Sequence, residues 1–102
     1  MKDQIERITQ MEGRLDRASE ALKHLEAALD EYIEAQADLR ELAAYLGSDD
    51  WCRDFDDDER GLLPQQLKRG VLAEDGIWNV LADARELNVR MLQTVADIMR
   101  QR

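Results

Sequence analysis

The sequence has few of the residues that interrupt helices and few of the side chains that fill a thick globular core. Among its 102 residues there are one proline, five glycines, two tryptophans, two tyrosines and one phenylalanine. Charged residues make up 36% of the chain. A composition rich in alanine, leucine, arginine, glutamine and acidic residues is typical of proteins built from long helices. We therefore expect the chain to bury a helical seam rather than a thick core.

Cysteine and long apolar runs are also scarce. Cys52 is the only cysteine, which excludes an intrachain disulfide and fits a reducing compartment. No run of about 18 apolar residues is present, so no segment is expected to span a membrane. The residues from Met1 to Glu6 lack the apolar run of a signal peptide. These features predict a soluble, cytoplasmic protein.

Acidic residues outnumber basic ones by 23 to 14, and the formal net charge is −9. An acidic surface repels phosphate backbones and anionic lipid headgroups. We therefore expect neither nucleic acid nor a membrane surface as a partner. A protein partner of unknown identity stays possible.

Apolar residues recur in alternating steps of three and four along the first half of the chain. The series is Ile8, Met11, Leu15, Ala18, Leu22, Leu25, Leu29, Tyr32, Gln36, Leu39, Ala43 and Leu46. Only Gln36 breaks its apolar character, and no proline interrupts it. This heptad repeat is typical of a coiled coil and predicts one long helix, from about residue 3 to residue 46, whose apolar stripe packs on another helix.

A column of small residues lies beside this stripe. Ala21, Ala28 and Ala35 follow one another at seven-residue spacing. Small side chains let a second helix approach closely, and the column widens the apolar face. A bundle of three or four helices is therefore favoured over a simple two-stranded coiled coil.

A helical turn segment is predicted over residues 47–72. Gly47 suits a left-handed stop for the first helix, and Ser48 suits the N-cap of a short second helix. Gly61 is expected to end that helix. Proline favours the first turn of a helix, so another short helix is predicted over Pro64–Arg69, and Gly70 is expected to stop it.

Large apolar residues in and after this segment are expected to pack the turn against the long helices. Trp51 is four residues before Phe55, so the two share one helix face. An exposed aromatic binding patch that includes Trp78 is the alternative to burial. The residues expected to pack the turn are Trp51, Phe55, Leu63, Ile77 and Trp78.

The last helix is predicted over residues 74–101, with a start between Ala73 and Asp75. It is much shorter than the first helix, so an antiparallel return leaves the beginning of the first helix uncovered. Exposed apolar side chains there are costly, and a second copy of the chain would cover them. The residues expected to mediate self-association are Ile5, Ile8, Met11, Leu15, Leu22 and Leu25.

These patterns predict an all-α fold in a single helical domain over residues 1–102. The architecture is a long helical hairpin with one or two short helices in the connection, which completes a bundle by dimerisation.

The acidic run in the turn segment is the weak candidate for a metal site. Its members are Asp54, Asp56, Asp57, Asp58 and Glu59. Calcium and magnesium prefer several oxygen ligands at defined positions, but the run lacks the glycine and the final glutamate that an EF-hand loop requires. A solvated helix face is the favoured interpretation. Lys68 and Arg69 are expected to form ion pairs with these carboxylates and so brace the turn. The alternative is that the two basic residues bind an anionic ligand.

The middle of the chain resembles the DUF4298 family, a group of short bacterial proteins with no assigned function. The resemblance covers most of the chain and is most specific between Tyr45 and Leu81. Two positions depart from the family pattern, because serine is usual at Ala73 and tyrosine at Trp78. The resemblance implies a mostly helical bacterial protein and brings no catalytic residues. Its motifs are Tyr45-Leu46-Gly47-Ser48-Asp49-Asp50-Trp51, Asp54-Phe55, Gly61-Leu62-Leu63-Pro64, Leu67-Lys68-Arg69-Gly70-Val71-Leu72 and Glu74-Asp75-Gly76-Ile77-Trp78-Asn79.

The sequence shows no histidine near a nucleophile, no metal triad and no phosphate loop, so an enzyme and a cofactor are not expected. The prediction is a non-enzymatic, self-associating adaptor or scaffold, with a homodimer as the favoured state. A regulator that binds a metal or a small ligand through the acidic run is the alternative.

Overall fold

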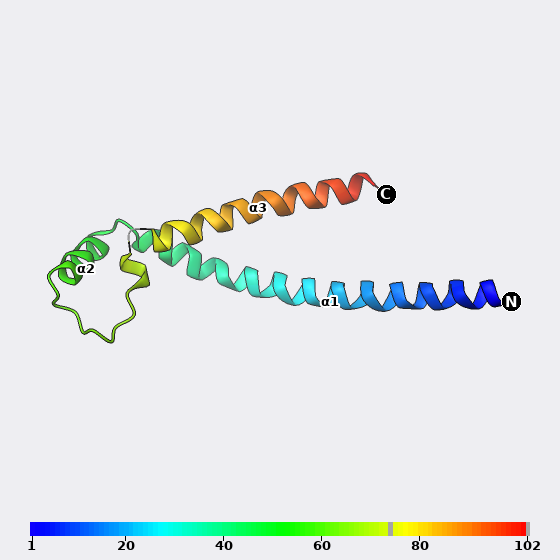
Figure 1. Ribbon diagram of the computed structural model, residues 1–102. Helices are drawn as coiled ribbons and strands as arrows, with labels where there is room; N and C mark the ends of the chain where they lie inside the picture. Colours follow the sequence, from blue (N-terminus) through cyan, green and yellow to red (C-terminus); the bar gives the residue numbers. More distant parts are fainter. Residues whose placement is uncertain (74, 102) are drawn as a thin grey trace. The chain divides into compact units, whose positions relative to one another are not determined.

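The computed structural model describes residues 1–73 and 75–101, and its regular structure is helical (Figure 1). Helix α1 spans Lys2–Tyr45, α2 spans Asp49–Glu59, the 3-10 helix η1 spans Gly70–Leu72, and α3 spans Gly76–Arg100. These described residues contain no strand. The expected all-α fold, with a long first and a long last helix and short helices between them, is confirmed. Dimerisation stays a prediction.

The chain divides into two compact units, Met1–Ala37 and Asp38–Arg102. The first unit consists of the greater part of α1. The second contains the last turns of α1 together with α2, η1 and α3. Across the described residues, no helix is long and apolar enough to cross a membrane.

Helix α2 begins where the sequence predicts a cap. Gly47 has a φ of 78°, the left-handed conformation that glycine adopts without steric cost. The Ser48 hydroxyl oxygen then accepts a hydrogen bond from the backbone N–H of Trp51 at 3.1 Å and donates to the carbonyl of Tyr45 at 2.6 Å. One side chain therefore joins the end of α1 to the start of α2.

The end of α2 is a Schellman motif built on Gly61, whose φ is 71°. The N–H of Leu62 donates to the carbonyl of Asp57, and the N–H of Gly61 donates to the carbonyl of Asp58, both at 3.0 Å. These bonds satisfy two of the carbonyls that a helix end leaves without partners.

The predicted helix over Pro64–Arg69 is wrong. The segment makes a single turn, in which the N–H of Leu67 donates to the carbonyl of Pro64 at 3.2 Å. The Arg69 guanidinium donates to the carbonyls of Pro64 and Leu67, and these are the acceptors that a continuing helix would need for its own N–H groups. The short 3-10 helix starts instead at Gly70, where a stop was expected.

The most buried side chains of the described residues lie in η1 and in the first turn of α3. Leu72 is 6% exposed and Ile77 is 3% exposed. Asp75 takes the N-cap position of α3 without a side-chain cap bond, so the helix begins at Gly76. Glu74, the first residue of the predicted last helix, lies outside the described residues.

Candidate functional site

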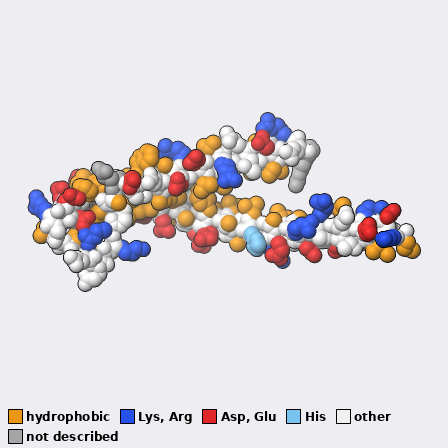
Figure 2. Space-filling model, in the orientation of Figure 1, with side chains coloured by type: hydrophobic (Ala, Val, Ile, Leu, Met, Phe, Trp, Pro, Cys, Tyr) orange, Lys and Arg blue, Asp and Glu red, His pale blue; other side chains and the backbone are white. Residues whose placement is uncertain are grey.

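The first candidate site is the apolar stripe of α1 within Met1–Ala37. Its large side chains are between 46% and 66% exposed, although buried positions would be expected for residues of their size. They recur along the helix, with charged side chains between them (Figure 2). The stripe includes Ile8, Met11, Leu15, Leu22, Leu25 and Leu29, and the equally exposed Ile5 and Ile33 lie beside it.

The six residues that the sequence assigned to self-association all belong to this exposed set. An isolated α-helix in water gains little from its own hydrogen bonds, and most helical stability in proteins comes from packing of an apolar face. The α1 stripe therefore has the composition and the exposure of a packing surface. Self-association itself stays a prediction.

The acidic run on α2 was the candidate metal site, and two of its carboxylates have partners inside the chain. Asp54 accepts a hydrogen bond from the hydroxyl of Tyr45 at 2.6 Å. Asp58 forms an ion pair with Arg69, and these side chains are 19% and 34% exposed. Bracing of the turn is therefore confirmed for Arg69, while Lys68 forms no ion pair within the described residues.

The remaining carboxylates of the run do not converge. Asp56 and Glu59 are exposed, and Asp57 is half-buried. Within residues 1–73 and 75–101, no group of three or more histidine, cysteine, aspartate or glutamate side chains is placed so that it could hold a metal ion. Asp54 and Asp58 therefore act as structural contacts of the turn, and the solvated helix face stays a prediction for the rest of the run.

The pair formed by Tyr45 and Asp54 changes the acidity of the phenol. The pKa of Tyr45 is raised from 10.0 to about 12, first by its hydrogen bond to the Asp54 carboxylate. Partial burial and the negative charges of Asp54 and Asp50 raise it further. Tyr45 therefore keeps its proton to a higher pH than an ordinary tyrosine does, and this proton ties the end of α1 to α2.

Arg69 holds the loop between α2 and η1 with three contacts. Its guanidinium donates to the carboxylate of Asp58, to the carbonyl of Pro64 and, at 3.3 Å from Nε, to the carbonyl of Leu67. The planar fork of arginine suits several acceptors at once. The sequence suggested the ion pair, but the two carbonyl contacts carry no sequence signal.

Two aromatic residues of the turn lie against each other. The rings of Trp51 and Phe55 are stacked with their centroids 5.2 Å apart. The Trp51 indole N–H donates to the carbonyl of Val71 at 2.9 Å and so connects α2 to η1. Leu63 is half-buried.

Trp78 does not occupy the packed position that we expected. Its side chain is 62% exposed, whereas its neighbour Ile77 is buried. Successive residues of an α-helix point about 100° apart, so Ile77 faces the interior of the second unit and Trp78 turns away from it. Trp78 instead belongs to the exposed apolar surface of α3.

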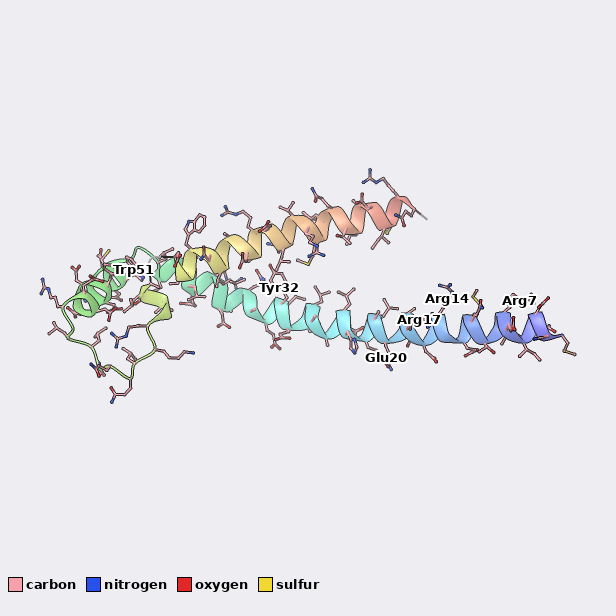
Figure 3. All side chains as sticks on the ribbon, in the orientation of Figure 1. Arg7, Arg14, Arg17, Glu20, Tyr32 and Trp51 are labelled. Carbon is pink, nitrogen blue, oxygen red and sulfur yellow. The ribbon has the colours of Figure 1, made fainter. Side chains whose placement is uncertain are left out.

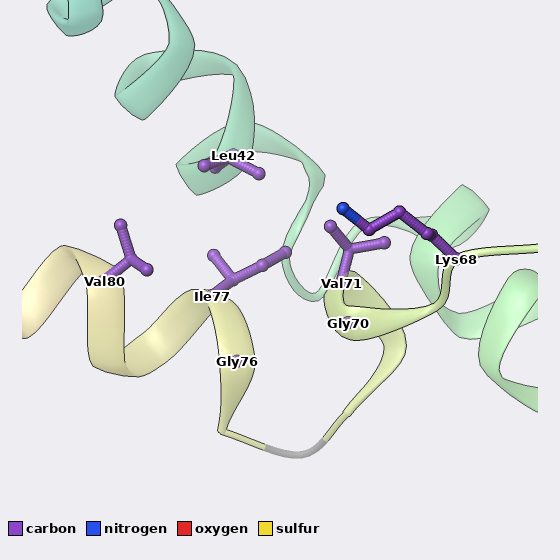
Figure 4. Close-up of a pocket in the computed structure, with 7 residues that line it drawn as sticks. All are labelled: Leu42, Lys68, Gly70, Val71, Gly76, Ile77 and Val80. Carbon is purple, nitrogen blue, oxygen red and sulfur yellow. The ribbon is translucent and has the colours of Figure 1, made fainter.

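A pocket of about 390 Å³ lies in the second unit where the end of α1 meets η1 and α3 (Figure 4). Its lining is apolar apart from one lysine and consists of Leu42, Lys68, Gly70, Val71, Gly76, Ile77 and Val80. Its formation depends on the close approach of two glycines. A Cβ atom at Gly76 would overlap the carbonyl oxygen of Gly70, so only glycine fits there. Sequence reasoning missed this pocket, because glycine spacing alone does not reveal a close approach.

Comparison with known proteins gives a family but no activity. No curated protein and no solved structure matches the chain. The model of one family, described as a domain of unknown function, matches residues 8–94, which covers the stripe, the turn segment and most of α3. The chain therefore belongs to the DUF4298 family.

Proposed function

We propose that this protein is a non-enzymatic helical protein that self-associates through the α1 stripe and acts as a small adaptor or scaffold. The observation that carries the proposal is the row of large apolar side chains on α1 that are about half exposed in the single chain. Monomeric proteins rarely expose long continuous apolar surfaces, and such surfaces mark interaction sites.

The surface of the second unit supports the adaptor role. Beyond Ile77, α3 presents large exposed apolar residues that another protein could contact: Trp78, Val80, Leu87, Val89, Leu92, Val95, Ile98 and Met99. A chain that self-associates through α1 leaves the exposed face of α3 available for contact with a different protein. The acidic surface of the chain favours a basic protein as the second partner.

The alternative of a metal-binding regulator has less support. Its carboxylates follow one another closely on α2 and so point to different sides of the helix, and Asp54 and Asp58 already have partners. The apolar pocket beside Lys68 favours an interaction with apolar groups rather than with a hard cation.

Sedimentation equilibrium of variants of the α1 stripe tests the proposal. Leu22→Asp places a charge in the stripe and is expected to weaken association at least tenfold, since burying a leucine contributes about 1.5–3 kcal/mol. Ala27→Asp places the same charge on the outer face of the same helix and serves as the matched control. Equal association of the two variants and the unmodified chain would remove the stripe from the proposal.

A further inference from the structure

Within Met1–Ala37, two large apolar residues of α1 lie outside its three-and-four series. Ile5 and Ile33 are separated by four heptads, so they occupy the same flank of the α1 stripe near its two ends. Both are more than half exposed. A partner helix must therefore supply apolar contacts at two points on one flank of the stripe.

The other flank of the stripe is a single column of arginine and then alanine. Arg7 and Arg14 begin it, and Ala21, Ala28 and Ala35 continue it at the same seven-residue spacing. Figure 3 labels the two arginines on the first half of α1. Within the part of the chain that the structure describes, neither arginine forms an ion pair. The first half of the flank thus carries long cations, and the second half carries small side chains.

We infer that a second copy of this chain lies antiparallel along Met1–Ala37, centred near Glu20. In this register, Ile5 of each copy meets Ile33 of the other copy. On the other flank, Arg7 of each copy lies over Ala35 of the other copy, and Arg14 lies over Ala28. The inference rests on the proposed self-association and adds its direction and register.

The inner positions of the stripe agree with this register. The small residue Ala18 falls opposite Leu22, and the polar residue Gln36 falls opposite another glutamine. Each layer can therefore be filled without a buried amide facing an apolar side chain. The layers are Ile8 with Tyr32, Met11 with Leu29, Leu15 with Leu25, Ala18 with Leu22, and Gln4 with Gln36.

The charges also favour the antiparallel direction. Arg14 of one copy lies over Ala28 of the other copy, one turn from Glu31, which offers it a carboxylate. The register has one kind of repulsive contact, between Glu12 of one copy and Glu26 of the other, which occurs twice in the symmetric pair. The antiparallel direction keeps the acidic second halves of the two helices apart from each other.

A parallel pair fits the same stripe less well. It offers Arg7 the carboxylate of Glu12 of the second copy, but it stacks an acidic segment on its own copy. That segment contains Glu26, Asp30, Glu31 and Glu34. It also leaves Ile5 without an apolar partner.

Disulfide trapping distinguishes the two directions. Ile5→Cys and Ile33→Cys chains, each carrying Cys52→Ser, are mixed and exposed to a mild oxidant. The two positions are roughly 42 Å apart along one helix, so a bond between them joins two molecules. We expect the mixed Ile5→Cys and Ile33→Cys dimer to be the main product, with little product from either chain alone. The control is the mixture of Glu6→Cys and Glu34→Cys chains, whose cysteines lie one residue further along and on the outer face of the helix. We expect this mixture to form little disulfide-linked dimer.

A charge variant provides a second, independent readout. Glu12→Lys removes the repulsion with Glu26 of the antiparallel partner and should lower the dissociation constant about tenfold. In a parallel pair the same change sets a lysine against Arg7 and weakens the dimer. Glu34→Lys changes the net charge equally on the outer face and corrects for overall repulsion.

The outcomes separate the two claims. A chain that stays monomeric at micromolar concentration removes the proposed self-association and the register with it. Disulfides between equal positions of the two copies, or a dimer weakened by Glu12→Lys, would agree with self-association and overturn the antiparallel register.

Discussion

The hydrogen bond from Tyr45 to Asp54 makes one phenol of this protein unusually weak as an acid. Because the folded pKa is about 12 and the ordinary value is 10.0, the folded state binds this proton more tightly than the unfolded state. The stabilisation is therefore fully present below about pH 10 and is lost as the pH rises towards 12.

Absorbance of the tyrosinate band measures this shift. At about pH 11 we expect Tyr45 to keep its proton in most molecules, whereas an ordinary tyrosine is mostly ionised. The difference between the unmodified chain and Tyr45→Phe isolates this residue from Tyr32. Asp54→Asn should lower the midpoint, and a midpoint near 10 in the folded unmodified chain would contradict the assignment.

Gly76 lies where two backbone segments approach each other closely. A methyl group there would meet the carbonyl oxygen of Gly70, which cannot move away without shifting η1. We expect Gly76→Ala to destabilise the chain by about 1–3 kcal/mol, the usual range for an overpacked site. Chemical denaturation followed by circular dichroism measures this effect.

Gly70→Ala is the matched control for that change. No atom lies within 4 Å of a Cβ atom at this position, so its effect should be neutral or slightly stabilising. Equal losses from both substitutions would show that helix geometry, rather than the close approach, explains the result.

The loop between α2 and η1 is held by the side chain of Arg69, the last residue of that loop. Arg69→Ala removes contacts to Asp58, Pro64 and Leu67 and leaves a partly buried carboxylate without its cation. We expect a loss of about 1–3 kcal/mol in the same denaturation assay. Arg69→Lys should restore little, because an ammonium group cannot reproduce the fork.

Lys68→Ala tests whether this effect is specific to Arg69. It removes the same charge from the neighbouring position, where the residue lines the pocket. A loss as large as that of Arg69→Ala would point to the overall charge of the loop.

Most element ends could be predicted because local residues determine them. Ser48 caps α2, and Gly47 and Gly61 adopt the left-handed conformation that ends the helices before them. The helix predicted over Pro64–Arg69 failed because a proline permits a helix start without requiring one. The Arg69 side chain competes for the same carbonyls, and such a contact from the end of the segment has no local signature.

The candidate sites were predictable to different degrees. The α1 stripe follows from periodicity, since it depends only on the spacing of residues along one helix. The pocket and the exposure of Trp78 depend on how η1 and α3 meet, and no spacing in the sequence encodes that contact.

The chain as a whole buries little when it is alone. In the described residues, Leu72 and Ile77 are the buried apolar side chains, while both long helices carry large exposed ones. Burial of apolar surface is the main favourable contribution to folding. A long helix such as α1 is therefore expected to gain stability from a partner that covers its stripe.

Native mass spectrometry of the gently purified, unmodified chain at micromolar concentration tests this conclusion most directly. We expect a homo-oligomer, with a mass of twice that of one chain as the main species. A stoichiometric second protein bound to that dimer would agree with the adaptor role. A species with the mass of a single chain throughout the micromolar range would contradict self-association through the α1 stripe.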